Sequence, residues 1–289
     1  MRNLKPLAVL AALVCPAALM VSPSVASESP ASAQAAAASG KIRPGVQMYT
    51  KGAQCTANFV FKDGRGRAYV GYAAHCAGLG EATDTNGCKA KSVPLGTPVR
   101  FATGGSLVDP GTTVGRGKLA YSSWRSMRRI GTKASNPCEY NDFALVRVNA
   151  GDVGKVNPTV PFFGGPKGLN TRGTSEGEQV YSYQNSSLRG GVSELSPKYG
   201  TSAGNGGNGG WSHTVYTATP GIPGDSGSGF LDSDGNAFGT LSTIAIAPLP
   251  ASNGVGDLSR ELAFAKQHSG IGGLRLVKGT KAFNPSPAG

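Results

Sequence analysis

The sequence GDSGSGFLDSDGNAFGTLSTI occupies residues 224–244 and contains the clearest structural signals of the chain. Two apolar runs, 229–231 inside this stretch and 237–246 continuing just beyond it, flank the turn Asp232-Ser233-Asp234-Gly235. An Asp-Gly-type turn between apolar runs is a strong signal for a β-hairpin. The turn also resembles a calcium-binding loop, but Ala237 and Thr243 replace the glycine and the bidentate glutamate that such a loop requires. We therefore predict a hairpin here and no metal site.

Short strands and glycine-containing turns recur along the chain. Residues 56–61 and 67–72 flank a turn that contains Asp-Gly, and residues 142–148 have the composition of a further strand. Only residues 258–268 predict a helix, because Asp257 can cap it and its apolar residues share one face. Strands and helices do not alternate. The pattern therefore predicts an all-β fold, as two barrels or a sandwich, with one helix near the C-terminus.

The composition agrees with this fold class. The chain has 289 residues, of which 44 are glycine and 19 are proline, and 39% are hydrophobic. That hydrophobic content is enough for a packed core, which excludes a wholly disordered chain. Charged residues make up 15%, against roughly 25% in a typical soluble domain, which argues against long charged helices or a coiled coil.

Residues 1–26 have the features of a secretory signal peptide. Arg2 and Lys5 precede an uncharged apolar stretch, and Ser24-Val25-Ala26 offers the small residues of a cleavage site. The apolar stretch is shorter than the roughly 20 residues of a membrane-spanning helix. Residues 27–41 are of low complexity and are predicted to be a leader or short propeptide. We expect a secreted, extracellular protein with no membrane attachment after the signal is removed.

The net charge of +12 raises the question of an anionic partner. Without the signal, 26 basic residues face 16 acidic ones, a net charge of +10. The basic residues are scattered except for Arg125, Arg128 and Arg129, and no aromatic side chains lie among these three. We interpret the cluster as a solvated basic face and expect no nucleic-acid partner.

Four cysteines remain once Cys15 is removed with the signal. An even number of cysteines in an exported protein favours two disulfides, and four cysteines allow three pairings. A zinc site is disfavoured, because only His75 and Cys76 are close in sequence and adjacent side chains make poor ligands to one ion. The four residues are Cys55, Cys76, Cys88 and Cys138.

Three motifs carry residues suited to nucleophilic catalysis, in the order His, Asp, Ser. They are Ala73-Ala74-His75-Cys76, Asn141-Asp142-Phe143-Ala144-Leu145 and Gly224-Asp225-Ser226-Gly227-Ser228-Gly229. A serine hydroxyl is a weak nucleophile and needs a base, and the base needs a carboxylate to orient it. A glycine-rich turn can aim backbone N–H groups at a developing oxyanion. Each motif is weak alone, but the combination is specific.

The reverse order, Ser226, Asp257, His268, would match an α/β-hydrolase. However, Ser228 stands where that fold has the second glycine of its nucleophile turn, and no alternating strands and helices surround it. This alternative is therefore poor.

At the three motifs the chain resembles the chymotrypsin-fold (trypsin-like, S1 family) serine proteases, particularly secreted enzymes of actinobacteria. The similarity covers roughly residues 45–250. It implies two six-stranded antiparallel β-barrels, here residues 42–155 and 156–289, the second including the helix and a C-terminal tail. The active site of this family lies in the cleft between the barrels.

The resemblance also implies a role for individual residues. His75 corresponds to the general base, Asp142 to its orienting carboxylate and Ser226 to the nucleophile, with the N–H groups of Gly224 and Ser226 forming the oxyanion hole. Ser242 corresponds to the serine that binds the triad aspartate and begins the substrate-binding strand. The implied disulfides are Cys55–Cys76 and Cys88–Cys138.

The chain departs from the family at its N-terminus. Activated members insert Ile-Val-Gly-Gly beside the aspartate that precedes the nucleophile, which is Asp225 here. This chain has Lys41-Ile42-Arg43-Pro44 instead, so we expect Asp225 to pair with an internal group.

The substrate pocket departs as well. Pro220 stands where trypsin has its specificity aspartate, and Ile244 stands where a glycine usually leaves room for substrate. Specificity for Arg or Lys is thus unsupported, and the pattern suggests a small or apolar pocket. Glutamate-specific relatives have a histidine beside the pocket, whereas we predict that His213 and His268 are ordinary surface residues.

Together these observations predict a secreted serine endopeptidase that acts on protein or peptide substrates, as a monomer and without a metal or organic cofactor. The alternative is a catalytically narrow or inactive protein of the same fold that binds a partner through its basic surface at Arg125, Arg128 and Arg129.

Overall fold

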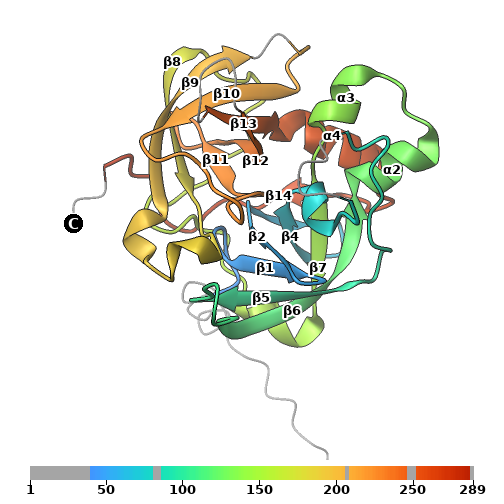
Figure 1. Ribbon diagram of the computed structural model, residues 1–289, viewed down its shortest axis with the longest axis horizontal. Helices are drawn as coiled ribbons and strands as arrows, with labels where there is room; N and C mark the ends of the chain where they lie inside the picture. Colours follow the sequence, from blue (N-terminus) through green and yellow to red (C-terminus); the bar gives the residue numbers. More distant parts are fainter. Residues whose placement is uncertain (1–39, 81–85, 206–207, 246–251, 287–289) are drawn as a thin grey trace, which may run out of the picture.

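The computed structural model describes residues 40–80, 86–205, 208–245 and 252–286. The predicted signal peptide, and all but the end of the predicted leader, lie outside these residues. Two antiparallel sheets make up most of the molecule, and the α-helices gather at one side of it (Figure 1). Among the described residues, no helix is both long and apolar enough to cross a membrane.

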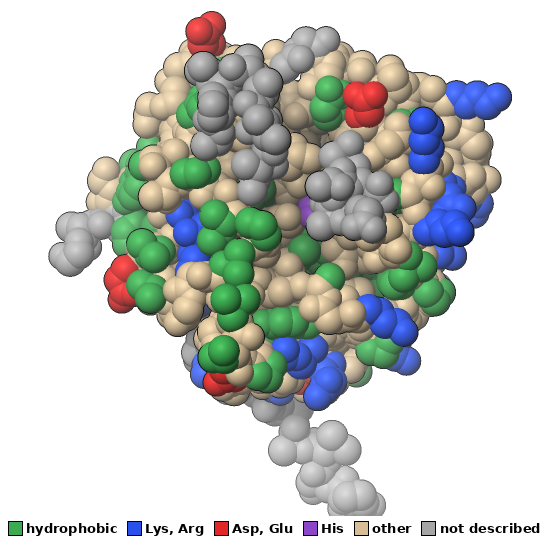
Figure 2. Space-filling view, in the orientation of Figure 1, with side chains coloured by type: hydrophobic (Ala, Val, Ile, Leu, Met, Phe, Trp, Pro, Cys, Tyr) green, Lys and Arg blue, Asp and Glu red, His purple; other side chains and the backbone are tan. Residues whose placement is uncertain are grey.

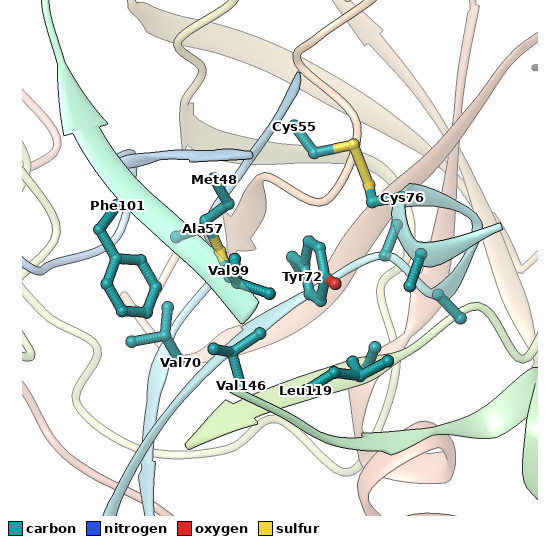
Figure 3. Close-up of a cluster of buried hydrophobic side chains, with 14 of the residues drawn as sticks. Met48, Cys55, Ala57, Val70, Tyr72, Cys76, Val99, Phe101, Leu119 and Val146 are labelled. Atoms are coloured by element: carbon teal, nitrogen blue, oxygen red, sulfur yellow. A yellow bond between two sulfur atoms is a disulfide. The ribbon is translucent and has the colours of Figure 1, made fainter. Parts of the chain in front are cut away.

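The N-terminal sheet has eight strands in the order β14-β3-β4-β7-β6-β5-β1-β2. Figure 3 shows side chains from several of these strands meeting in one buried cluster, which includes Met48, Val70, Phe101 and Val146. The strands are β1 (Gln47–Thr50), β2 (Ala53–Thr56), β3 (Val60–Lys62), β4 (Ala68–Tyr72), β5 (Pro98–Thr103), β6 (Thr112–Ser122), β7 (Ala144–Val148) and β14 (Arg275–Leu276).

The C-terminal sheet closes into a six-stranded barrel in the order β10-β13-β12-β11-β8-β9. Alternate residues of its strands point inward, as the period-two geometry of a strand requires, and fill the barrel with Val180, Val215, Phe230 and Val255 among others. The strands are β8 (Glu176–Tyr183), β9 (Pro197–Asn205), β10 (Ser212–Thr217), β11 (Gly229–Leu231), β12 (Ala237–Ala245) and β13 (Ser252–Asp257).

The predicted all-β class is confirmed, and both predicted hairpins form, as β3–β4 and β11–β12. The N-terminal sheet has more strands than the six that the resemblance implies. One reason is that the C-terminal tail returns to the N-terminal sheet, where β14 pairs with β3.

The predicted helix forms as α4 (Leu258–His268), and Asp257 caps it by accepting a hydrogen bond from the N–H of Arg260 (2.9 Å). Its apolar face enters a second buried cluster that contains residues of both sheets, so α4 holds the two sheets together. Leu258 and Leu262 on α4 pack in that cluster with Phe143, which directly follows Asp142.

Two further helices, α2 (Ser123–Ile130) and α3 (Ser135–Tyr140), were not predicted. Both are short, and α2 buries only two large apolar residues, Trp124 and Met127, about one turn apart. Such a sparse pattern does not reveal a helix, because packing rather than propensity stabilises it. Four short 3₁₀ helices complete the structure: η1 (Ala74–Ala77), η2 (Ala150–Lys155), η3 (Ser187–Arg189) and η4 (Ser193–Leu195).

Candidate active site

His75 and Asp142 meet because the strands beside them pair. His75 lies in η1 just after β4, and Asp142 lies just before β7. These strands are antiparallel, with Tyr72 opposite Ala144. The chain that leaves β4 therefore lies beside the chain that enters β7.

A compact hydrogen-bond network joins three of the predicted site residues. The ring Nδ1 of His75 lies 2.6 Å from Asp142 Oδ2, and the backbone N–H of His75 donates to Asp142 Oδ1 (2.8 Å). Ser242 Oγ donates to Asp142 Oδ2 (2.6 Å). The carboxylate is thus held by three donors, which orients it toward the imidazole.

Each member of the pair stabilises the charged form of the other. Burial acts to lower the pKa of His75, but the charge and hydrogen bond of Asp142 outweigh burial, so the pKa is raised. Burial acts to raise the pKa of Asp142, but His75 and Ser242 outweigh it, so this pKa is lowered. The Asp142 carboxylate favours a proton on Nδ1, which leaves Nε2 of the neutral ring as a proton acceptor.

The segment around Ser226 is a tight turn that only glycine permits at two positions. Gly224 and Gly227 have φ values of 96° and 90°, in the region that other residues rarely adopt. At Gly227 a Cβ would lie 2.6 Å from the carbonyl oxygen of Thr56 and 2.8 Å from the backbone nitrogen of Ala73. The turn therefore packs its backbone directly against the chain that leads to His75.

Two links attach this turn to the histidine loop, by which we mean η1 with His75 and the residue before it, Ala73. The backbone N–H of Thr56 donates to the carbonyl oxygen of Ser226 (2.8 Å). Cys55, next to Thr56, forms a disulfide with Cys76, next to His75 (Figure 3). The second disulfide joins Cys88 to Cys138, shortly before Asp142. Both pairings are those that the resemblance implied.

The turn leaves two backbone donors free. The carbonyl oxygen of Gly224 accepts hydrogen bonds from Thr56 Oγ1 (2.8 Å) and Gln54 Nε2 (3.1 Å), which fix the peptide plane. Among the hydrogen bonds of the described residues, none uses the N–H of Gly224 or of Ser226. These are the two groups that the resemblance assigns to the oxyanion hole.

Asp225 has the internal partner that its sequence context predicted. Its carboxylate is fully buried and forms an ion pair with Arg189 of η3. It also accepts hydrogen bonds from the N–H groups of Ser186 (2.9 Å) and Ile222 (3.0 Å). A new N-terminus is therefore not needed to pair with Asp225.

Sequence reasoning missed Glu261, a fully buried residue on α4. Its Oε1 accepts a hydrogen bond from the backbone N–H of Asp142 (3.3 Å), and its Oε2 accepts one from Thr240 Oγ1 (2.9 Å). Burial, and then the nearby charges of Asp142 and Asp257, raise the pKa of Glu261 well above its usual range. Glu261 therefore holds the backbone of Asp142, and a glutamate on a helix carries no sequence signal for this role.

The prediction that His213 is a surface residue was wrong. Its side chain is fully buried, with Nε2 3.0 Å from Asp257 Oδ2 and Nδ1 3.0 Å from Thr174 Oγ1. Inward-facing positions of β10 enter the barrel, so this histidine needs buried polar partners and has them. His268 is half-buried at the end of α4, stacked against Phe264. Asp257 thus binds His213, which disfavours the alternative order Ser226, Asp257, His268.

A cysteine–histidine cluster at the site does not make a metal centre. The sulfurs of Cys55 and Cys76 and a ring nitrogen of His75 lie within 4.8 Å of one another. Both sulfurs are in a disulfide, so neither can be the thiolate that binds zinc.

The basic cluster lies on α2, in the part of the molecule where Figure 2 shows Lys and Arg side chains gathered at the right of the face. Arg125 donates to the carbonyl oxygens of Ser92 and Val93, and Arg129 donates to that of His268 (2.9 Å). These arginines therefore have structural contacts with neighbouring segments.

Two other predicted positions concern the substrate pocket. Pro220 is half-buried and precedes the turn around Ser226. The side chain of Ile244 lies outside what the structure describes, so its predicted obstruction of the pocket stays a prediction.

No family model matches the sequence, and no curated protein matches it closely. Solved structures do match. Thermobifida fusca protease A is 16% identical, with a TM-score of 0.49 over 82% of this chain and 99% of that one. A Nocardiopsis protease is 18% identical, with a TM-score of 0.47 over 81% and 98%. A glutamic acid-specific serine protease that uses a histidine triad in substrate binding is 18% identical, with a TM-score of 0.46 over 82% and 100%. The arrangement of the two sheets in this chain is that of a chymotrypsin-like fold.

Proposed function

We propose that this protein is a secreted serine endopeptidase in which Ser226, His75 and Asp142 form the catalytic triad. Two features together carry the proposal. His75 and Ser242 are both hydrogen-bonded to Asp142, and the glycine-containing turn around Ser226 packs against the histidine loop. A metal-independent acyl transfer requires a nucleophile, an oriented base and preorganised oxyanion donors, and the chain has a candidate for each.

The mechanism follows from these contacts. Nε2 of His75 takes the proton of the Ser226 hydroxyl as Oγ attacks the carbonyl carbon of the scissile peptide. Asp142 stabilises the imidazolium that forms. The N–H groups of Gly224 and Ser226 bind the oxyanion of the tetrahedral intermediate. His75 then gives its proton to the departing amine as the peptide C–N bond breaks, which leaves the acyl-enzyme. In the second half-reaction His75 takes a proton from water as the water oxygen attacks the acyl carbon. His75 then returns that proton to Ser226 Oγ as the ester bond breaks and the acid product leaves.

Covalent labelling with a fluorophosphonate tests this function. The protein lacking residues 1–26 should take one label per molecule, and Ser226→Ala should take none. Ser193→Ala, at an exposed serine of η4, is the matched control and should label like the wild type. If the folded wild type takes no label, or if Ser226→Ala still does, the proposed nucleophile is wrong.

A further inference from the structure

Lys198 is a buried cation without an anionic partner. It lies on β9 and is only 2% exposed. Its ammonium group donates to Thr219 Oγ1, and within the described parts of the chain no carboxylate lies within 4.0 Å of it. Lysine is almost never fully buried without a charged partner, because the loss of hydration is costly.

The carboxylate whose charge acts on Lys198 is already engaged. Asp225 is paired with Arg189 and accepts two backbone hydrogen bonds as well. Lys198, Arg189 and Asp225 together therefore carry one positive charge in excess. Burial and then Arg189 lower the pKa of Lys198 to about 8, against the opposing effect of Asp225, so the ammonium group is charged at neutral pH.

A second polar group without a partner lies on the same inner face. Lys198 is opposite Ser182 in the β8–β9 pairing, so Gln184 shares its face of the sheet. Gln184 is fully buried, and neither its amide oxygen nor its amide nitrogen has a hydrogen-bond partner. An ideal Cβ at Gly221 would lie 3.8 Å from Gln184 Oε1, which places the amide beside the segment that leads to Ser226.

These groups are next to the nucleophile turn and close to solvent. Thr219 and Gly221 bracket Pro220, the residue six positions before Ser226. Thr219 is itself exposed, so the ammonium group of Lys198 lies directly beneath the surface. An ammonium group without an anionic partner and an amide without a hydrogen-bond partner are suited to bind a carboxylate.

We propose that Lys198, assisted by Gln184, binds the side-chain carboxylate of the substrate residue that precedes the scissile bond, so that the protein cleaves after acidic residues. This inference rests on the proposed function and adds its substrate class. It replaces the small or apolar pocket that Pro220 and Ile244 suggest. None of the three histidines is placed for the role. His75 belongs to the proposed triad, His213 is bonded to Asp257 and Thr174, and His268 lies at the end of α4 against Phe264.

Matched peptide substrates that differ only in that residue test the inference. We expect kcat/KM for Glu to exceed that for the isosteric Gln by roughly 10- to 100-fold, the size of one charge-assisted hydrogen bond. Lys198→Met keeps the stem and removes the charge, so the ratio should fall to within about 3-fold. Lys167→Met, the same change at an exposed lysine, should keep the wild-type ratio.

Thermal unfolding of the same variants gives a readout that does not depend on activity. Because Lys198→Met removes an uncompensated buried charge, its Tm should equal or exceed that of the wild type. Lys198→Gln serves as the second variant if the methionine packs poorly. A wild type that cleaves after apolar or basic residues would overturn the acidic specificity and leave the proposed function intact. Retention of the Glu preference in both Lys198 variants would overturn the role of this residue, whereas a wild type without fluorophosphonate labelling would overturn the proposed function itself.

Discussion

The Arg189–Asp225 pair should be essential to the stability of the nucleophile turn. The Asp225 side chain is fully buried and that of Arg189 is 9% exposed. In Arg189→Met the carboxylate would keep two backbone donors, Ser186 and Ile222, but lose its counter-charge. Breaking a buried ion pair from one side costs about 3–5 kcal/mol. Because the two donors remain, we expect the lower end, about 3 kcal/mol.

The chain offers a matched control in the exposed pair Arg172–Asp234, whose side chains are 76% and 61% exposed at a separation of 3.5 Å. Arg172→Met should change the free energy of unfolding by less than about 0.5 kcal/mol, because solvent screens such pairs. The double variant Arg189→Met/Asp225→Asn removes both charges, and it should recover a large part of the loss.

Urea denaturation of the four proteins measures these differences, and a constant m-value would show that the unfolded states are comparable. The Tm of Arg189→Met should fall by roughly 6–12 °C. Its kcat should also fall, by on the order of 10- to 1000-fold, because Asp225 lies between Gly224 and Ser226, the two proposed oxyanion donors. The stabilising role of the Arg189–Asp225 pair would be refuted if Arg189→Met were as stable as the wild type. It would also be refuted if Arg172→Met lost as much free energy of unfolding as Arg189→Met.

Three further predictions concern the site and the disulfides. His75 must be neutral to accept a proton, and Asp142 raises its pKa, so kcat/KM should rise with pH through a midpoint above about 6.5. Asp142→Asn should lower kcat by on the order of 10⁴-fold and move that midpoint to lower pH, as a pH–rate profile would reveal; an unmoved midpoint would contradict the coupling. The pKa of Glu261 is raised in the folded protein, so protonation of this side chain favours folding. That stabilisation is complete below about pH 4 and is lost as the pH rises through the pKa that Glu261 has in the folded state. Glu261→Gln should therefore gain stability relative to wild type with rising pH in urea titrations, and a constant difference would argue against a neutral Glu261. Removing the Cys88–Cys138 bridge, which closes a 50-residue separation, by double alanine substitution should lower the free energy of unfolding by about 4 kcal/mol, and a loss below 1 kcal/mol would exclude a stabilising bridge.

Local signals explain which parts of the fold could be predicted from sequence. The hairpins β3–β4 and β11–β12 have their turn residues between their strands, and α4 has its cap directly before it. In each case the interacting residues are close in sequence, so composition and periodicity reveal them. The two missed helices, α2 and α3, have no comparable signal, because only a few of their residues are buried.

Sequence reasoning anticipated one polar contact and misplaced one polar side chain. The contact between Ser242 and Asp142 was anticipated, but His213 was placed on the surface and is buried. The residue type alone does not show whether a histidine in a strand faces solvent or the barrel interior. Its environment depends on strand register, which single-residue patterns do not specify.

The sequence by itself determined the residue types of the proposed site, their order along the chain and the glycines that allow the turn at Ser226. Only the tertiary structure decided which buried polar and charged groups meet. Glu261 supports Asp142 across 119 positions, and Arg189 neutralises Asp225 across 36. Lys198, by contrast, is left without a counter-charge, and no local pattern reveals this. The physical reason is that nearby residues are constrained by backbone geometry, whereas the free energy of a buried charge depends on every group that folding brings around it.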